Sequence, residues 1–193
     1  MDKYTNKHIE TAELVDTINN CIDCINKLED SELINYYPLA FINIFVKFQN
    51  VVYLLFEIYC VGQPSSAGYL PELLHNFNDE IELRKFLGNK NKDYIDYDDR
   101  IRELADFIFR PNVFENLFYL SPVSYTNLKY IRNYIAHESD SSKNKVVQAG
   151  IIRENEVLGT YFLKRNSRGK INFNEIVHNL YEYCSYLIEG PEN

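Results

Sequence analysis

A short stretch of the chain, LKYIRNYIAHES at residues 128–139, places an arginine, an asparagine and a histidine close together. Asn133 and His137 are four residues apart, so on a helix they project from one face and can hydrogen-bond. An asparagine at that distance can hold the imidazole in one tautomer and one orientation. Arg132 lies about 140° round an ideal helix from His137, yet its long side chain can reach the same pocket or a second copy of the helix.

An arginine and a histidine with no associated cysteine or serine nucleophile and no carboxylate cluster suit one reaction class, the cleavage of RNA. In that reaction the nucleophile is the 2′-hydroxyl of the substrate itself. A histidine can move the protons at neutral pH, and the fork of an arginine can stabilise the charge on the phosphate. Neither a cofactor nor a metal ion is needed. The simpler interpretation is a packed face of a dimer, with Arg132 paired to an acid on a neighbouring helix.

The elements that must position these residues are mainly helical, because apolar residues recur at helical spacing along most of the chain. The pattern predicts five principal helices, at residues 5–28, 36–62, 99–109, 121–138 and 174–190. Pro38 falls in the first turn of the second helix, where proline is tolerated. Either Ser121, followed by Pro122, or Ser124 begins the helix that carries the motif.

The chain is predicted to form a single helical domain over residues 1–193, with two interruptions. An irregular insertion at residues 62–99 follows the second helix and contains two short helical pieces and a polar surface loop. A small β-hairpin at residues 143–172 precedes the last helix, because short β-type runs flank the turn-forming sequences ENE and NSRG.

Charge is unevenly distributed along the chain. The net charge is −8, yet residues 143–170 hold seven basic and two acidic residues, a local charge of +5 that leaves −13 for the remainder. Four of these basic residues are candidates for binding RNA phosphates: Lys164, Arg165, Arg168 and Lys170. A solvated loop, or one that docks on an acidic protein partner, is the alternative.

The second helix is apolar nearly all round and carries one polar line at positions 43, 47, 50 and 57. Charged residues at mid-depth argue against a membrane span, and the N-terminus lacks the apolar core of a signal peptide. We therefore expect a cytoplasmic protein. From the polar line, Lys47 and Asn50 are candidates for lining the site, although such a line more often marks where a buried helix meets solvent or a dimer partner.

Four cysteines include one C-x-x-C pair, Cys21 and Cys24. The pair lies in the middle of a predicted helix, with no second C-x-x-C and no histidine nearby, which disfavours a zinc or redox site. We interpret both residues as small core side chains and expect no bound metal. The 16 tyrosines suit wide, half-buried surfaces, including contacts between subunits.

The sequence RNYIAH at residues 132–137 resembles the signature of the HEPN family, in which an arginine, usually followed by a polar residue, precedes a histidine by a few positions. The resemblance implies an antiparallel helical bundle and a metal-independent endoribonuclease whose site forms across a homodimer. By the same resemblance, Arg132 would bind the scissile phosphate, Asn133 would set the geometry, and His137 would act as general acid or base.

Proteins of this family are often toxins or antiviral defence factors, so the resemblance also implies RNA as substrate and an antitoxin or regulatory protein as a possible partner. In one toxin subgroup, inhibition by nucleotide transfer uses a tyrosine two positions after the histidine. This chain has Ser139 there, so that mode of control is not implied. Other members bind RNA or proteins without cutting, and a non-catalytic binding module is the alternative function.

Overall fold

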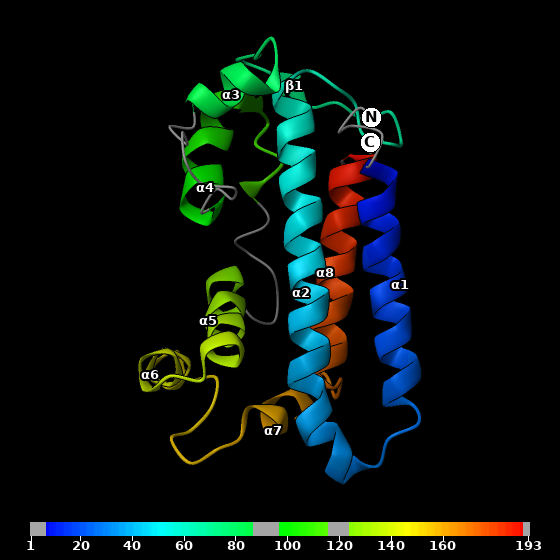
Figure 1. Cartoon of the computed structure of the whole chain (residues 1–193), viewed down its shortest axis with the longest axis vertical. Helices are drawn as coiled ribbons and strands as arrows, with labels where there is room; N and C mark the ends of the chain where they lie inside the picture. Colours follow the sequence, from blue (N-terminus) through cyan, green and yellow to red (C-terminus); the bar gives the residue numbers. More distant parts are fainter. Residues whose placement is uncertain (1–6, 87–96, 116–123, 191–193) are drawn as a thin grey trace. The chain divides into compact units, whose positions relative to one another are not determined.

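The computed structural model describes residues 7–86, 97–115 and 124–190, which are mainly helical with one small antiparallel sheet (Figure 1). The helices are α1 (Lys7–Ile25), α2 (Asp30–Cys60), α3 (Glu80–Phe86), α4 (Tyr97–Ile108), α5 (Tyr125–His137), α6 (Asp140–Gln148), α7 (Leu158–Leu163) and α8 (Asn172–Glu189). The strands are β1 (Glu72–Leu73) and β2 (Phe109–Arg110), with Glu72 opposite Arg110 and Leu73 opposite Phe109. The predicted helical class is therefore confirmed.

The chain divides into two compact units, and the long helices α1, α2 and α8 contribute to both. The first unit comprises residues 1–11, 49–117 and 182–193, and the second comprises residues 12–48 and 118–181. The predicted single domain stays a prediction. The motif and the basic segment both belong to the second unit.

Helix α2 begins earlier than predicted. It starts at Asp30, so Pro38 lies inside the helix rather than in its first turn. The start is favoured because the Glu32 carboxylate accepts a hydrogen bond from the backbone N–H of Glu29 at 3.0 Å. Pro38 has no N–H to give to the carbonyl four residues earlier, that of Ile34.

That carbonyl lies against Gly159 in α7. A Cβ atom at position 159 would come 1.7 Å from the carbonyl oxygen of Ile34, a distance that no real contact allows. Glycine is therefore required where α7 crosses α2, and the absence of an N–H on Pro38 leaves this carbonyl without its helical partner. The proline and the glycine belong to the same helix crossing.

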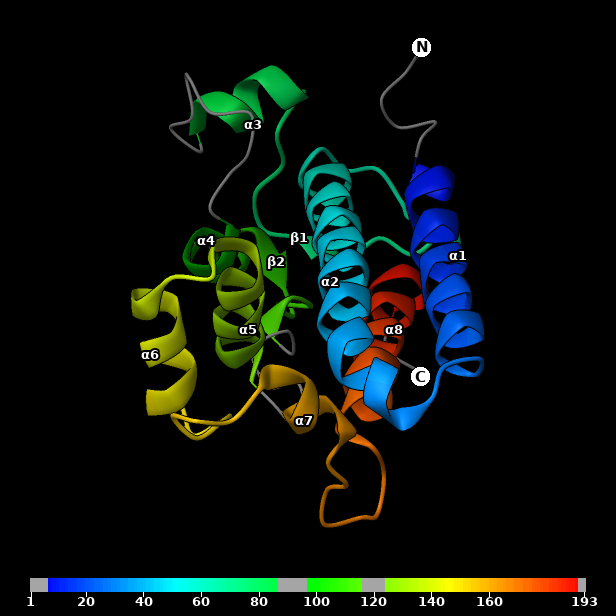
Figure 2. The same ribbon diagram turned by 60° about the horizontal axis from the view of Figure 1, so that its bottom comes forward.

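The core of the second unit is built on aromatic side chains of α2. Phe41 stacks on Phe45 with ring centroids 5.4 Å apart, and Phe41 also lies 5.3 Å from Phe162 of α7. Tyr37 lies 4.6 Å from Phe173 of α8. All of these side chains are almost fully buried, so the first half of α2 holds α7 and the start of α8 in place (Figure 2).

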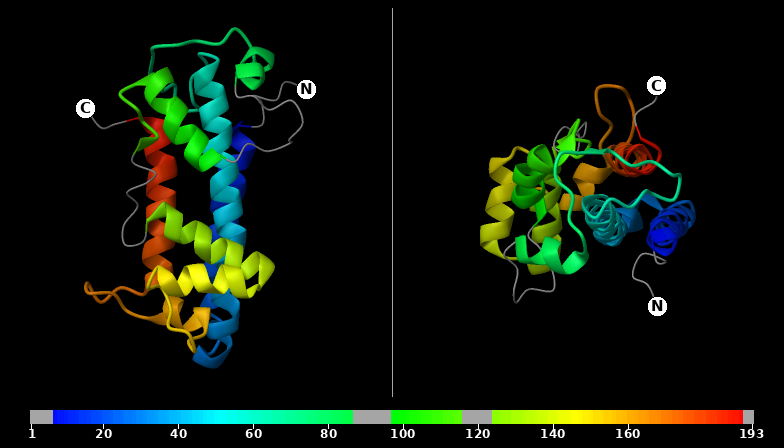
Figure 3. Two further views of the ribbon diagram at one scale, coloured as in Figure 1. Left: turned by 90° about the vertical axis from the view of Figure 1, so that its left-hand side faces the viewer. Right: turned by 90° about the horizontal axis from the view of Figure 1, so that it is seen from above.

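The first unit contains the predicted insertion. The first of its two expected helical pieces is replaced by β1, which pairs with β2, and the second is α3 (α3 and α4 are green in Figure 3). Most of the expected polar loop lies outside the described residues. Phe109 and Phe114 pack on Phe56 of α2, with centroids 5.9 Å and 5.4 Å away.

The predicted β-hairpin at residues 143–172 is wrong. Helices α6 and α7 occupy much of it, and the only strand-like pairing in the described part of this segment is one bridge between Arg165 and Ile171. Ser139 explains the difference at the start, because its hydroxyl caps α6 in a reciprocal pair with Ser142. The NSRG turn was predicted correctly: the backbone N–H of Gly169 donates to the carbonyl of Asn166 at 2.9 Å.

Helix α2 is long and apolar enough to cross a membrane by length and composition alone. More than half of its most apolar stretch is buried within the fold. The predicted polar line is only partly exposed, because Asn43 and Asn50 face solvent whereas Glu57 is buried. In the C-x-x-C pair, Cys21 is buried as expected, but Cys24 is exposed and is not a core residue.

We expect Gly159→Ala to destabilise the fold by about 3 kcal/mol, the upper end of the cost of overpacking, because the new methyl group meets backbone rather than a movable side chain. Chemical denaturation monitored by circular dichroism measures this. Gly150→Ala is the control: Gly150 has a φ of +71° and open space around it, so only the backbone cost of about 1 kcal/mol applies. Equal losses in the two variants would contradict the close crossing.

Candidate functional site

Helix α5, which carries the motif, has well-defined ends. It begins after Ser124, whose hydroxyl accepts a hydrogen bond from the backbone N–H of Asn127 at 3.3 Å, so the second of the two predicted caps is confirmed. The Ser121 alternative lies outside the described residues. The helix ends at His137 because Glu138 adopts the left-handed conformation, with φ 45° and ψ 29°. The chain then turns directly into α6, which lies beside α5 (Figure 2).

Packing fixes which face of α5 is exposed. Tyr125, Leu128 and Ile131 are buried, and the ring of Tyr125 lies 5.7 Å from Phe45 and 6.4 Å from Phe48 of α2. Thr126, Ala136 and His137 are exposed, and the remaining residues of the helix, Asn133 among them, are half-buried. The motif therefore lies at the exposed end of a helix whose rotation is set by the core.

Arg132 and Asn133 form a direct contact. The Nη1 atom of Arg132 donates to Oδ1 of Asn133 at 2.8 Å, and both side chains are half-buried. This bond links the guanidinium to Asn133, and on an ideal helix Asn133 and His137 are only about 40° apart. Of the three predicted residues, Arg132 and Asn133 are in direct contact, and His137 lies one helical turn beyond Asn133.

The role predicted for Asn133 differs in the structure. Its amide oxygen accepts from Arg132, and among the described residues no hydrogen bond reaches the imidazole of His137. Asn133 thus orients the arginine rather than the histidine. The hydrogen bond between neighbouring residues occupies the amide oxygen that the four-residue spacing would have offered to His137.

The candidates on α2 have other surroundings. Lys47 forms an ion pair with Glu13 of α1, within the second unit. Asn50 is exposed and belongs to the first unit. The predicted lining role of Lys47 and Asn50 stays a prediction. Across the described residues, no three side chains of the metal-binding types come together.

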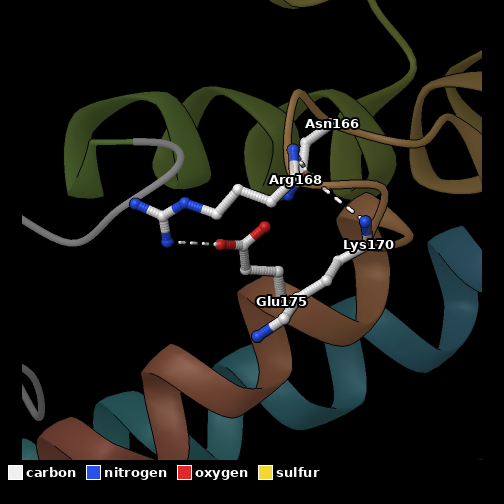
Figure 4. A network of polar contacts seen from close by, with 4 residues as sticks. All are labelled: Asn166, Arg168, Lys170 and Glu175. Carbon is white, nitrogen blue, oxygen red and sulfur yellow. Dashed lines mark hydrogen bonds and ion pairs between the residues drawn. The ribbon is translucent and has the colours of Figure 1, made fainter.

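The loop after α7 presents its basic residues on an ordered turn. Oδ1 of Asn166 accepts from the backbone N–H groups of Arg168 at 2.9 Å and Lys170 at 3.1 Å (Figure 4). Arg165 donates from Nη1 to the carbonyl oxygen of Gly169 at 2.7 Å. These bonds close the turn from inside, so the loop needs little further ordering to receive a ligand.

The four basic candidates differ in how much of their charge is already paired. Lys164 forms an ion pair with Glu156, and Arg168 contacts Oε1 of Glu175 at 3.4 Å. Arg165 is bonded to a neutral carbonyl, and within the described residues no carboxylate pairs with Lys170. Arg165 and Lys170 therefore provide most of the positive charge available to an anion. The net charge counted from the sequence therefore overstates the positive charge available to a ligand, because a count cannot show which basic residues form ion pairs.

Comparison of the chain with protein-family models, with curated proteins and with solved structures finds no match.

Glu175 is the polar residue of this region that the sequence interpretation missed. It is the only acidic residue in the first turn of α8 and only 5% exposed. A single glutamate at the start of a helix is common and gives no signal by itself. Its significance comes from the fold, which places it beneath the basic loop (Figure 4).

The pKa of Glu156 is lowered from its ordinary value of 4.5, first by the hydrogen bond from Lys164 and then by the backbone N–H of Arg153. Because the folded-state pKa is depressed, this contact stabilises the fold above pH 4.5, and its contribution is lost as the pH falls through the lowered pKa. Both groups lie near the surface, so the contribution to stability is small.

We expect Lys164→Ala to raise the pKa of Glu156 toward 4.5, since the main donor to its carboxylate is removed. Carbon-13 NMR titration of the glutamate side chains measures the change. Lys145→Ala, which removes one positive charge from the exposed surface of α6, is the matched control and should leave Glu156 unaffected. An identical Glu156 titration in wild type and Lys164→Ala would contradict the ion pair.

Proposed function

We propose that this protein is a metal-independent endoribonuclease of the HEPN type, with Arg132, Asn133 and His137 at its site. The observation that carries the proposal is the hydrogen bond from Arg132 to Asn133 on the same helix face as the exposed His137. An oriented guanidinium and an accessible imidazole on the same helix are the minimum set of groups for cleaving RNA by internal attack.

In the proposed reaction, the 2′-hydroxyl of a ribose attacks the adjacent phosphorus, and the bond to the 5′-oxygen of the next nucleotide breaks. The proton of the 2′-hydroxyl passes to a base, and the leaving 5′-oxygen receives a proton from an acid. His137 performs one of these transfers. Arg132, held by Asn133, donates to the non-bridging phosphate oxygens as negative charge develops on them.

A homodimer completes the site in this proposal. One imidazole cannot accept a proton from the attacking hydroxyl and supply one to the leaving oxygen at the same moment. A second copy of α5 would bring a second His137 and a second Arg132 to the same phosphate. The exposure of His137 at the end of α5 supports this arrangement, because a partner can approach it directly.

RNA is held, in this proposal, by the basic loop that contains Lys164, Arg165, Arg168 and Lys170. Such a positive surface is needed because the rest of the chain is strongly acidic and repels polyanions. By the HEPN resemblance, the setting is cytoplasmic toxin activity or antiviral defence, controlled by an antitoxin or regulatory protein.

A non-catalytic RNA-binding module of the same fold is the second candidate function. It is favoured by one observation, that no described residue orients the imidazole of His137. A general acid or base usually has such a partner. The two functions differ in whether RNA is cut or only bound.

We expect His137→Ala to reduce RNA cleavage by roughly a hundred- to ten-thousand-fold, the usual effect of losing a general acid or base. Arg132→Lys should reduce it strongly as well, because a lysine keeps the charge but lacks the fork that donates to phosphate. Cleavage of labelled mixed RNA, followed by gel electrophoresis in the presence of EDTA, measures both effects.

The matched control is His75→Ala, which removes an exposed histidine from the other unit and should leave cleavage unchanged. Melting curves of all the variants establish that they fold. Equal RNA cleavage by wild type and His137→Ala would show that His137 is not the general acid or base. Tight binding of RNA by the wild-type protein without any cleavage would favour the non-catalytic module.

A further inference from the structure

Glu175 has an unusual environment for a carboxylate. Its side chain is 5% exposed, and its Oε2 atom has no hydrogen-bond partner among the described residues. The other oxygen receives only the long contact of 3.4 Å from Arg168, whose own side chain is 70% exposed. Burying a carboxylate with one oxygen unsatisfied is costly, so the group requires a donor that the folded chain does not supply.

Glu175 lines a cavity of about 380 Å³ between the basic loop and the first turns of α8. Its wall also contains two cations, an amide and an imidazole, from Arg165, Lys170, Asn174 and His178. The cavity therefore has an acceptor in one place and positive charge in another. A ligand that fits must offer hydrogen-bond donors to the carboxylate and negative charge to the two cations.

We propose that this cavity binds one guanine nucleotide of the RNA, with the base donating to Glu175 and its phosphate held by Arg165 and Lys170. The inference rests on the proposed function, because it assumes that RNA is the natural ligand. Guanine presents two adjacent donors, N1–H and the 2-amino group, to a carboxylate. Uracil places a carbonyl oxygen on each side of its single N–H, and these oxygens repel the carboxylate.

Arg168 must move for the base to reach the carboxylate. Oε2 of Glu175 is closed off from solvent, and Arg168 contacts the other oxygen of the same carboxylate, Oε1, at 3.4 Å (Figure 4). The guanidinium is mostly exposed and makes one long contact, so little is lost when it swings away. Its charge then becomes available to a neighbouring phosphate, which couples reading of the base to binding of the backbone.

The loop that forms one side of the cavity is already ordered. Asn166 holds the backbone of Arg168 and Lys170, and Arg165 is fixed to the carbonyl of Gly169. The backbone of the turn and the guanidinium of Arg165 are therefore held in place without a ligand. A prearranged wall of this kind lowers the entropy lost on binding and is more consistent with a specific subsite than with a solvated loop.

Isothermal titration calorimetry with GMP and UMP tests the proposal on the full-length His137→Ala variant, so that cleavage plays no part. We expect GMP to bind at least about tenfold more tightly than UMP, the effect of a hydrogen bond to a charged group. Glu175→Gln should abolish that preference. Lys170→Ala, an exposed change that cannot disturb the core, should weaken both nucleotides equally.

Glu154→Gln is the matched control, because it removes an exposed carboxylate from the same unit and should leave the preference intact. Equal affinities for GMP and UMP, or a preference that survives in Glu175→Gln, would overturn the proposal. The result is separable from the proposed function. A preference for GMP without RNA cleavage by the wild type would support the guanine site at Glu175 and contradict the ribonuclease activity. RNA cleavage by the wild type without any preference for GMP would support the ribonuclease activity and contradict the guanine site.

Discussion

The arrangement of the second unit depends on the aromatic side chains that the first half of α2 buries. Tyr37, Phe41 and Phe45 contact α8, α7 and α5 in turn, so one helix sets the positions of three others. Full burial of each such side chain stabilises the fold by roughly 1.5–3 kcal/mol. Their combined effect far exceeds that of the surface ion pairs in the same unit, each of which contributes about 1 kcal/mol or less.

The geometry of the motif follows from this packing. The burial of Tyr125 against Phe45 and Phe48 fixes the rotation of α5, which leaves Asn133 half-buried and His137 exposed. The left-handed residue Glu138 then ends the helix immediately after the histidine. His137 is accessible because the helix stops there, and Arg132 is oriented because it remains half-buried beside Asn133.

The same packing also places the basic loop above α8. The crossing of α7 over α2, where Gly159 lies against the carbonyl of Ile34, directs the chain into the loop that follows α7. Phe173 in the first turn of α8 is held by Tyr37 and Phe162. Glu175, two residues further along α8, is thereby buried next to the cations of the basic loop.

Local patterns in the sequence predicted the helical class, the motif helix with Ser124 as the rival to Ser121 as its cap, and the inward face of α8, where Ile176, Leu180 and Leu187 are buried. Predictions failed where a distant contact decides the local structure. Pro38 predicts a helix start, because a proline further inside a helix removes one backbone hydrogen bond. In the structure Pro38 lies inside α2, and the carbonyl of Ile34 that loses its partner lies where α7 crosses α2 at Gly159.

The hairpin was predicted from β-type residues such as Val146 and Ile151, whose preference depends on having a neighbouring strand. No strand pairs with them in the described part of the chain, and both side chains are buried, Val146 within α6 and Ile151 just after its end. A charge count likewise could not predict the ion pairs of Lys164 with Glu156 and of Arg168 with Glu175. Charges on one segment can be summed from the sequence, but which of them are neutralised depends on the fold.

The chemistry of the RNA ends tests the central claim most directly. Products made by the wild-type protein in the presence of a chelator can be analysed by mass spectrometry. Attack by the 2′-hydroxyl predicts fragments that end in a 2′,3′-cyclic phosphate and begin with a 5′-hydroxyl. Fragments with a 3′-hydroxyl and a 5′-phosphate would show that water or another nucleophile attacks, and would contradict the role assigned to Arg132 and His137.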